Sequence, residues 1–472
     1  MSRQKNLMKN TAILSLSTFI PKLVAIVVTP VLTAHLTKEE YGQYDLIATV
    51  VSLLLPAVTL QISSAAFRFL IDKKNDRVES ARIVSNIFAF VIPMSLAAIA
   101  VYSLVVGADP GINHGLICLY FFSDIILIVT QQVARGLGKN LVYSVSAVIR
   151  SAVDMLCVLL LVGGLGRVNL GLTGVLIAMT LSTIAAWLFL AVKTGIFGYL
   201  GLKYISGGVL KELLAYSWPM VPNNLSGWVL RLSNRLVITA FLGIEANAVY
   251  AAANKIPHVF SAVQNTFIYA WQENASIASI DEDKDAYYSQ MCDGIFRVVL
   301  GLMAGLIMAS PVLFRLLIRG DYDGAYEQMP VLFLGMLFSC MSSVVGGIYI
   351  AFKKTKSVGI STMVAALLNL AIDLALIREI GIWAGSVSTA ASYLALLVYR
   401  MVDVQKFQKV TFHIPRICLG VLLLVVMAWL NFQRNLLCDG MNVLLFAGII
   451  LLFDRDMLKI MYKKFRKKLL KR

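Results

Sequence analysis

Long apolar segments follow one another along almost the whole chain, and this pattern constrains the fold more than any other feature. A helix that crosses the hydrocarbon core of a bilayer needs about 20 predominantly apolar residues. Because lipid cannot satisfy backbone polar groups, such segments are expected to be helical. Fourteen segments qualify, near residues 11–35, 43–66, 83–106, 114–135, 141–163, 170–192, 213–242, 246–270, 292–318, 328–352, 357–378, 381–403, 413–432 and 436–453. We expect an all-α integral membrane protein with about fourteen transmembrane helices.

Composition supports this class. The 472 residues are 59% hydrophobic and 14% charged, whereas soluble domains average about 45–50% apolar and about 25% charged residues. No small-residue cleavage site follows a short apolar core near the N-terminus, so we expect the first segment to stay as a span. The six cysteines form no CxxC pair and the four histidines lie far apart, which argues against a disulfide framework and a metal site.

Basic residues are distributed unequally between the two sets of loops. With the N-terminus in the cytoplasm, 30 of the 42 Lys and Arg residues fall in cytoplasmic segments and six in outer ones. This bias follows the positive-inside rule and predicts a multi-pass protein with both termini cytoplasmic. It also explains the net charge of +16 without a nucleic-acid partner.

Short similarities suggest that the chain is duplicated. LTKEEYGQY (36–44) is similar to LGIEANAVY (242–250), and GLTGVLIAMT (171–180) is similar to GIWAGSVSTA (381–390). We expect two pseudo-symmetric six-helix lobes, residues 1–212 and 213–410, related by an axis along the membrane normal around a central cavity. Residues 411–454 supply two further helices. The basic segment 455–472 is expected to lie on the anionic leaflet as an interfacial helix, with a disordered basic tail as the alternative.

Charged and amide residues within the spans are candidates for function, because burying them in a membrane is costly. The first two helices of each predicted lobe carry polar residues at helical spacing, so we expect them to surround one hydrated, positively charged cleft. The candidates are Lys22, Arg150, Arg231, Arg235, Lys255, Asn224 and Asn254 for substrate binding, and Asp124, Asp154 and Asp373 for ion coupling.

Structural interpretations of these residues stay open. Arg150 and Asp154 are one turn apart and form a structural ion pair equally well. For Asp124 and Asp373, pairing with a neighbouring helix is the favoured interpretation. The polar stripes are also of the kind that holds helices together in membranes.

Sequence signatures of catalysis are missing. GLGKN (136–140) lacks the upstream glycine and the Ser or Thr of a phosphate-binding loop, and neither HExxH nor GxSxG occurs. We expect no enzyme activity, no metal and no cofactor, apart from coupling to a proton or sodium gradient.

Four motifs resemble a known family. They are LTKEEYGQYDL after the first span, LQISSAAFRFL (60–70), SWPMVPNNLSGWVLRLSNRLVI (217–238) and GIYIAFKKTKS (347–357). Together they resemble Wzx-type polysaccharide flippases of the multidrug/oligosaccharidyl-lipid/polysaccharide exporter superfamily, over residues 5 to about 410. The resemblance implies turnover of undecaprenyl-pyrophosphate-linked oligosaccharides across a bacterial plasma membrane for capsule, O-antigen or exopolysaccharide. It places Arg68 where a lipid headgroup would enter, and implies membrane lipids, a polysaccharide polymerase and glycosyltransferases as partners.

Other functions compete with this one. A multidrug exporter of the same superfamily would expel organic cations, which a positive cleft disfavours. A flippase for the peptidoglycan lipid precursor is close in architecture and poorly separated by sequence. A membrane polymerase or acyltransferase would need a larger outer loop or a site centred on histidine, and His114 is isolated.

Overall fold

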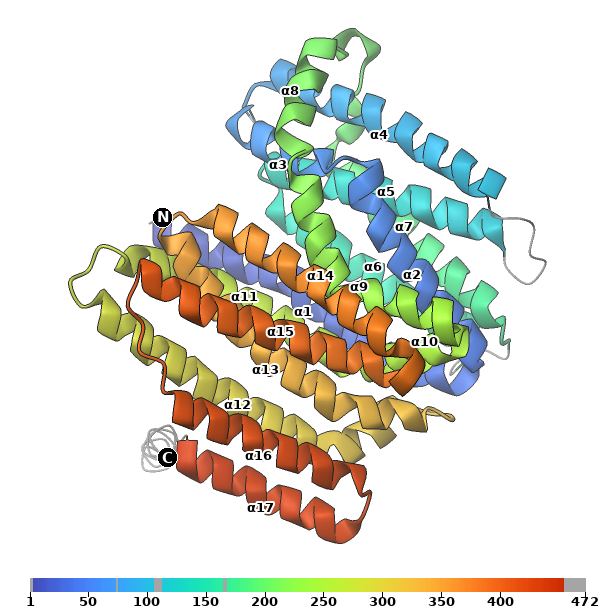
Figure 1. Ribbon diagram of the computed structural model, residues 1–472. Coiled ribbons are helices and arrows are strands. Elements are labelled where there is room, and N and C mark those ends of the chain that lie inside the picture. The colour runs from blue at the N-terminus through green and yellow to red at the C-terminus, as the bar shows by residue number, and fades with distance from the viewer. Residues whose placement is uncertain (1–2, 74, 106–112, 164–167, 454–472) are drawn as a thin grey trace, which may run out of the picture. The chain divides into compact units, whose positions relative to one another are not determined.

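The structure, a computed structural model, describes residues 3–73, 75–105, 113–163 and 168–453, and every regular element within them is helical (Figure 1). The elements are α1 (Arg3–His35), α2 (Lys38–Val58), α3 (Ile62–Lys73), α4 (Arg77–Val105), α5 (His114–Gly136), α6 (Asn140–Leu161), α7 (Gly171–Thr194), η1 (Ile196–Tyr199), η2 (Leu202–Tyr204), α8 (Gly207–Ser217), α9 (Met220–Leu242), α10 (Ile244–Ala253), α11 (Lys255–Ala278), α12 (Lys284–Leu317), α13 (Asp323–Ala351), α14 (Thr355–Ile380), α15 (Trp383–Asp403), η3 (Val404–Lys406), α16 (Ile414–Phe432) and α17 (Leu436–Phe453). The predicted all-α membrane class is confirmed. The segment 455–472, expected to be interfacial, lies outside the described residues.

Eleven described helices are long and apolar enough to cross a membrane. The count of about fourteen is therefore not confirmed. The expected spans that fall short correspond to α1, to α8 with α9, and to α10 with α11. Within the described residues, α1 contains the shorter apolar helix Phe19–His35 and α9 contains Leu232–Leu242. Among the predicted site residues, Lys22 lies in α1, Arg231 in α9 and Lys255 in α11.

Several predicted spans are interrupted, and proline explains the breaks. Pro219 lies between α8 and α9, and Pro257 stands in the first turn of α11, directly after α10. A proline donates no backbone hydrogen bond, and its ring collides with the carbonyl four residues earlier. Between α2 and α3, Leu60 and Gln61 have φ of 45° and 56°, a left-handed conformation that ends the helix.

The chain divides into two compact units. Unit 1 comprises residues 1–248 and 317–320, and unit 2 comprises residues 249–316 and 321–472. In unit 1, α6 packs against α1 and α7, α5 packs against α3 and α7, and α9 packs against α2. The prediction of lobes at residues 1–212 and 213–410 rests on the repeat and stays a prediction.

Unit 2 is organised around α13, in which 83% of the residues of the apolar span are buried. This helix packs against α11, α15 and α16, and α14 packs against α15. The last two helices lie beside α12 (Figure 1). Gly420 of α16 approaches Phe296 and Leu300 closely, and Gly305 approaches Phe446 of α17.

One carboxylate in unit 1 caps two helices. Glu40 Oε2 accepts a hydrogen bond from the Thr37 backbone N–H at 2.9 Å, which completes a capping box at the start of α2. Its Oε1 accepts from the N–H of Leu172 at 3.1 Å, at the start of α7. Gly171 has φ 53°, and a Cβ there would overlap Glu40 Oε1. This junction joins the LTKEEYGQY segment to the sixth predicted span.

Candidate functional site

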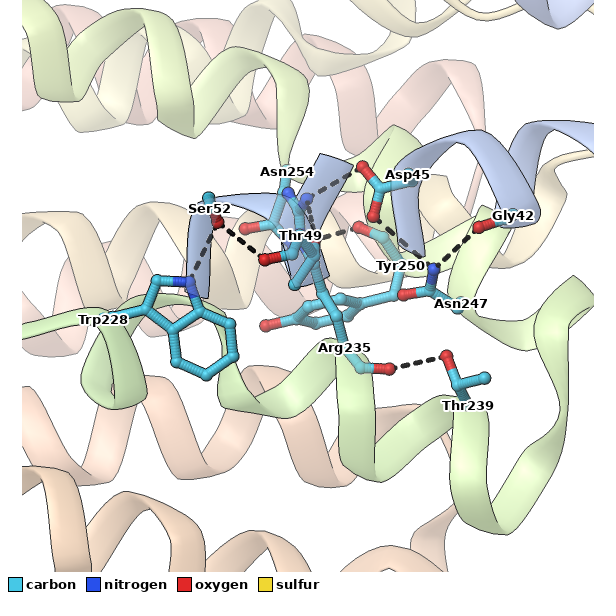
Figure 2. Close-up of polar contacts among 10 residues, drawn as sticks. All are labelled: Gly42, Asp45, Thr49, Ser52, Trp228, Arg235, Thr239, Asn247, Tyr250 and Asn254. Carbon is cyan, nitrogen blue, oxygen red and sulfur yellow. Dashed lines mark hydrogen bonds and ion pairs between the residues drawn. The ribbon is translucent and has the colours of Figure 1, made fainter. Parts of the chain in front are cut away.

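The best-defined polar site in unit 1 is a buried ion pair between α2 and α9. Arg235 Nη1 lies 2.8 Å from Asp45 Oδ1 and also donates to Thr49 Oγ1 at 3.1 Å (Figure 2). The two charged side chains are only 10% and 5% exposed. A buried charge is tolerated when it is paired and hydrogen-bonded, so the pair neutralises both groups between the helices.

Backbone geometry builds the other side of this site. Asn247 Nδ2 donates to Gly42 O at 3.3 Å and to Asp45 Oδ2 at 3.5 Å. A side chain at position 42 would overlap the backbone carbonyl of Ile244, so glycine is what allows α2 and α10 to approach. We call Asp45, Thr49, Arg235 and Asn247 the Asp45 cluster. Gly42 and Asp45 both belong to the motif after the first span.

A second contact extends the polar face of α2. Trp228 Nε1 donates to Ser52 Oγ at 2.9 Å, and the indole is 6% exposed (Figure 2). Asp45, Thr49 and Ser52 thus all point toward α9. The sequence predicts a polar face on the second span, but helical spacing does not show which residue of another helix pairs with Arg235. The spacing of Asp45 and Thr49, one turn apart, was the signal for an interhelical partner.

A second ion pair joins α5 and α6. Arg150 Nη2 lies 2.8 Å from Asp124 Oδ1, and the side chain of Asp124 is 8% exposed. The Tyr120 hydroxyl accepts from the same guanidinium at 3.5 Å. The favoured interpretation of Asp124, pairing with a neighbouring helix, is therefore confirmed. The interpretation that Arg150 pairs with Asp154 is wrong, because Arg150 forms its ion pair with Asp124 of α5 instead. Packing of α5 against α6 brings this more buried carboxylate to the guanidinium. Asp154 is half-buried.

The remaining predicted cations occupy different environments. Lys22 is half-buried in α1, and no carboxylate of the described residues lies within ion-pair distance of it. Arg68 is exposed on α3 and pairs with Asp72 one turn later. Lys255 is half-buried at the start of α11. The side chain of Arg231 lies outside the described part of the structure.

The predicted amide residues are half-buried on their helices. Asn224 lies in the first turns of α9. Asn254 stands at the junction of α10 and α11, where its Nδ2 donates to Tyr250 O at 2.9 Å (Figure 2). That contact is a local cap for the broken helix. The substrate-binding roles of both residues stay predictions.

Unit 2 holds a buried carboxyl group of a different kind. Asp373 of α14 is fully buried, and neither of its oxygens has a hydrogen-bond partner among the described residues. One turn earlier, Asn369 donates to Ser388 Oγ at 3.4 Å and Ser392 Oγ at 3.3 Å of α15. The pairing of Asp373 with a neighbouring helix is therefore not seen within the described residues. No three His, Cys, Asp or Glu side chains converge in this part of the chain.

Arg400 is a buried cation that is not among the residues singled out from the sequence. It is 4% exposed in α15. Its guanidinium donates to Ser342 O at 2.8 Å, to Ser361 Oγ at 3.1 Å and to Thr362 Oγ1 at 3.0 Å. Neutral acceptors on α13 and α14 thus hold the end of α15. Its position at the end of an apolar span hid this role.

Comparison with known proteins shows which family the chain belongs to. Residues 7–271 match the family of polysaccharide biosynthesis proteins, which is more than half of the sequence. The chain belongs to this family. Its motifs LTKEEYGQYDL and SWPMVPNNLSGWVLRLSNRLVI lie inside the matched region, so the family region contains the whole Asp45 cluster. No curated protein matches the sequence.

Solved structures with the same fold are transporters. A lipid II flippase MurJ in an inward closed conformation shares 12% identity, covers 95% of this chain and 99% of its own, and has a TM-score of 0.70. An inward-facing multidrug resistance MATE transporter of the MOP superfamily shares 13% identity over 83% of this chain and 98% of its own, with a TM-score of 0.68. A MOP superfamily transporter from Pyrococcus furiosus, described as having a binding pocket of reverse polarity, shares 15% identity over 84% and 96%, with a TM-score of 0.56. This polysaccharide biosynthesis protein therefore has the MOP superfamily transporter fold and is a multi-pass membrane protein.

Proposed function

We propose that the chain is a flippase for polyprenyl-pyrophosphate-linked oligosaccharides, which it moves from the cytoplasmic to the outer leaflet of a bacterial plasma membrane. The family match and the transporter fold support this proposal. The observation that carries it is the polarity of α1, α9 and α11. These helices stand among apolar spans yet carry lysines, arginines and asparagines, as a path for a hydrophilic glycan requires.

The proposed mechanism is alternating access. Lys22, Arg231, Arg235 and Lys255, with Arg150, would bind the pyrophosphate, because charge-assisted hydrogen bonds to phosphate are strong. Asn224 and Asn254 would contact the sugars, and Arg68 would receive the headgroup. Arg235 already pairs with Asp45, and Arg150 with Asp124. If these arginines also bind the pyrophosphate, ligand binding would weaken or break the two ion pairs.

Complementation tests the function. The full chain is expressed in a bacterium deleted for its own oligosaccharide flippase, and surface polysaccharide is measured. We expect wild type to restore polysaccharide and Lys22→Ala to lose most of it at matched expression, since Lys22 lacks a described carboxylate partner. Arg68→Ala tests the headgroup role, and Lys211→Ala, an exposed cation on α8 of the same unit, is the control. Failure of wild type with several glycans would contradict the proposal.

A second candidate is a flippase for the peptidoglycan lipid precursor. The TM-score of 0.70 with the lipid II flippase, over nearly the full length of both chains, favours it. Rescue of a strain depleted of its peptidoglycan flippase, without restoration of surface polysaccharide in the first assay, would select this function. Both functions imply both chain termini in the cytoplasm, and the first adds a polymerase and glycosyltransferases as partners.

A further inference from the structure

Unit 1 contains an apolar groove that the proposed transport path does not use. It lies between α4, α5, α7 and η1 and has a volume of about 390 Å³. Phe88, Ile126 and Ile196 form its buried floor, and Ile92, Leu119 and Phe197 form an exposed rim. Pockets that bind small ligands have volumes of roughly 300–1,000 Å³, so the groove is large enough for part of a lipid chain.

Polar residues of α4 hold the segment that closes one end of this groove. Ser85 Oγ donates to Tyr199 O at 2.9 Å and accepts from the N–H of Gly201 at 3.1 Å. Asn86 Nδ2 donates to Tyr204 O at 3.0 Å, and its Oδ1 accepts from the N–H of Ser206 at 2.9 Å. These bonds fasten residues 196–206 across the end of α4, so the wall that contains Phe197 and Leu200 is built into the unit.

Basic residues gather at this closed end. The Arg77 guanidinium lies against Gly198 in η1. Lys139 Nζ donates to Thr194 O at 2.8 Å, at the end of α7. Lys193, in the last turn of α7, and Lys203, in η2, are both exposed. Lys203 Nζ lies 5.0 Å from the Tyr204 ring centroid. We call Arg77, Lys139, Lys193 and Lys203 the basic rim.

Nearby acidic groups are largely occupied. Asp76 Oδ1 accepts hydrogen bonds from the backbone N–H groups of Val78 and Glu79, which caps α4. Glu79 pairs with Arg82 at 2.8 Å. Within the described residues, Arg77, Lys193 and Lys203 have no carboxylate at ion-pair distance. The rim therefore keeps a positive field beside an apolar groove.

The tryptophan that lines the groove adds a third feature. Trp187 contacts Phe197 edge-on at 6.3 Å between ring centroids. Its indole nitrogen is covered but has no hydrogen-bond acceptor within the described part of the chain. It lies seven residues before the end of α7, or about 10 Å at 1.5 Å per residue. Trp187 therefore lines the groove with its ring rather than with its N–H, and tryptophan is typical of the membrane interface.

We propose that this groove is a binding site for an acidic glycerophospholipid. One acyl chain would lie between α4, α5 and α7 against the Trp187 ring, with the phosphate on the basic rim. Charge complementarity selects the acidic headgroup, because the rim is cationic and the groove itself is apolar. The site lies on unit 1 alone, and its existence does not depend on which substrate is transported.

A second groove on the same helices provides an internal comparison. It is smaller, about 170 Å³, and is lined by residues of α2, α4 and α5 that include Leu46, Ile99 and Ile117. It lies toward the opposite ends of α4 and α5, where Tyr102 hydrogen-bonds to His114 at 2.9 Å. Its lining, like that of the first groove, contains no charged residue, so it serves as the comparison for filling a groove with a larger side chain.

Quenching of Trp187 fluorescence by brominated lipids tests the proposal. The full chain is reconstituted in phosphatidylcholine vesicles that contain brominated phosphatidylglycerol or, at the same mole fraction, brominated phosphatidylcholine. The Trp187 contribution is the difference between wild type and Trp187→Phe. We expect stronger quenching by the acidic lipid and a loss of this preference at high salt. Equal quenching by the two lipids would overturn the proposal.

Substitutions in the basic rim and in the groove test where the lipid binds. Arg77→Gln with Lys203→Gln should lower the preference for the acidic lipid about tenfold, given the contribution of each basic residue near a membrane surface. Lys211→Gln, on exposed α8, is the matched control and should keep it. Ser123→Phe fills the groove and should reduce Trp187 quenching by both lipids, whereas Ile99→Phe in the second groove should not. Quenching unaffected by Ser123→Phe, or lowered equally by Lys211→Gln, would contradict the proposal even if transport is confirmed.

Discussion

At the scale of single residues, the Asp45 cluster shows how a charged side chain is held inside a membrane bundle. Arg235 meets a carboxylate, a hydroxyl and, through Asp45, the amide of Asn247. Asp45 and Arg235 are 190 residues apart in the sequence. Each charge is therefore neutralised by a residue of another helix. Separation of the two partners leaves a buried, unpaired charge, which is among the most destabilising changes a protein can suffer.

This argument predicts the effect of breaking the pair. Asp45→Ala should destabilise the purified protein by about 3–5 kcal/mol, because Arg235 stays buried without its counter-charge. The measurement is the thermal unfolding midpoint in detergent. The double variant Asp45→Ala with Arg235→Met should recover most of the loss. A double variant no more stable than Asp45→Ala alone would show that the two side chains act independently.

At the scale of the elements, the apolar helices could be predicted from sequence and the polar ones only in part. Eleven of the described helices are long and apolar enough to cross a membrane, and length and composition are properties that the sequence itself contains. The breaks near Pro219 and Pro257 follow from local chemistry, but the break at Leu60 and Gln61 carries no proline or glycine at the turn itself. The partners of Arg235 and Arg150 depend on tertiary packing, which helical spacing within one segment does not contain.

The junction at Glu40 provides a prediction about elements. Gly171→Ala should lower the unfolding midpoint markedly, because φ is 53° and the new Cβ overlaps the Glu40 carboxylate. Gly207→Ala is the matched control, since that glycine starts α8 with open space around it and should tolerate the change. Equal effects of the two substitutions, measured by thermal unfolding in detergent, would rule out the double cap as the cause.

At the scale of the whole molecule, the two similar segments each contain a tyrosine that contacts a helix of its own unit. Tyr44 packs with Leu172 and Leu176 of α7 in unit 1, and Tyr250 donates a hydrogen bond to Gly385 O of α15 at 3.3 Å in unit 2. The two tyrosines align in the similar segments 36–44 and 242–250, and α7 and α15 contain the other similar pair. The two contacts differ in kind, one apolar packing and the other a hydrogen bond, so the repeat stays a prediction.

Coupling to an ion gradient would be a property of the whole transporter, and Asp373 is the strongest of the three carboxylate candidates. Asp124 is engaged with Arg150, whereas Asp373 is fully buried without a described partner. We expect Asp373→Asn to keep or raise thermal stability, because it removes the need to bury a carboxyl group. Transport in vesicles should lose its dependence on an imposed proton or sodium gradient. Asp72→Asn, on the exposed part of α3, is the control, and unchanged gradient dependence in Asp373→Asn would exclude the role.

The double cap at Glu40 has a consequence for the order of assembly during synthesis. The capping box within α2 closes over three residues, as soon as that helix forms, while the bond to Leu172 must wait until 132 more residues have been made. During that interval Glu40 Oε1, at the start of α2, does not yet accept the hydrogen bond from α7. The bond can form only once the start of α7 lies beside Glu40, so it belongs to a late step in the assembly of unit 1.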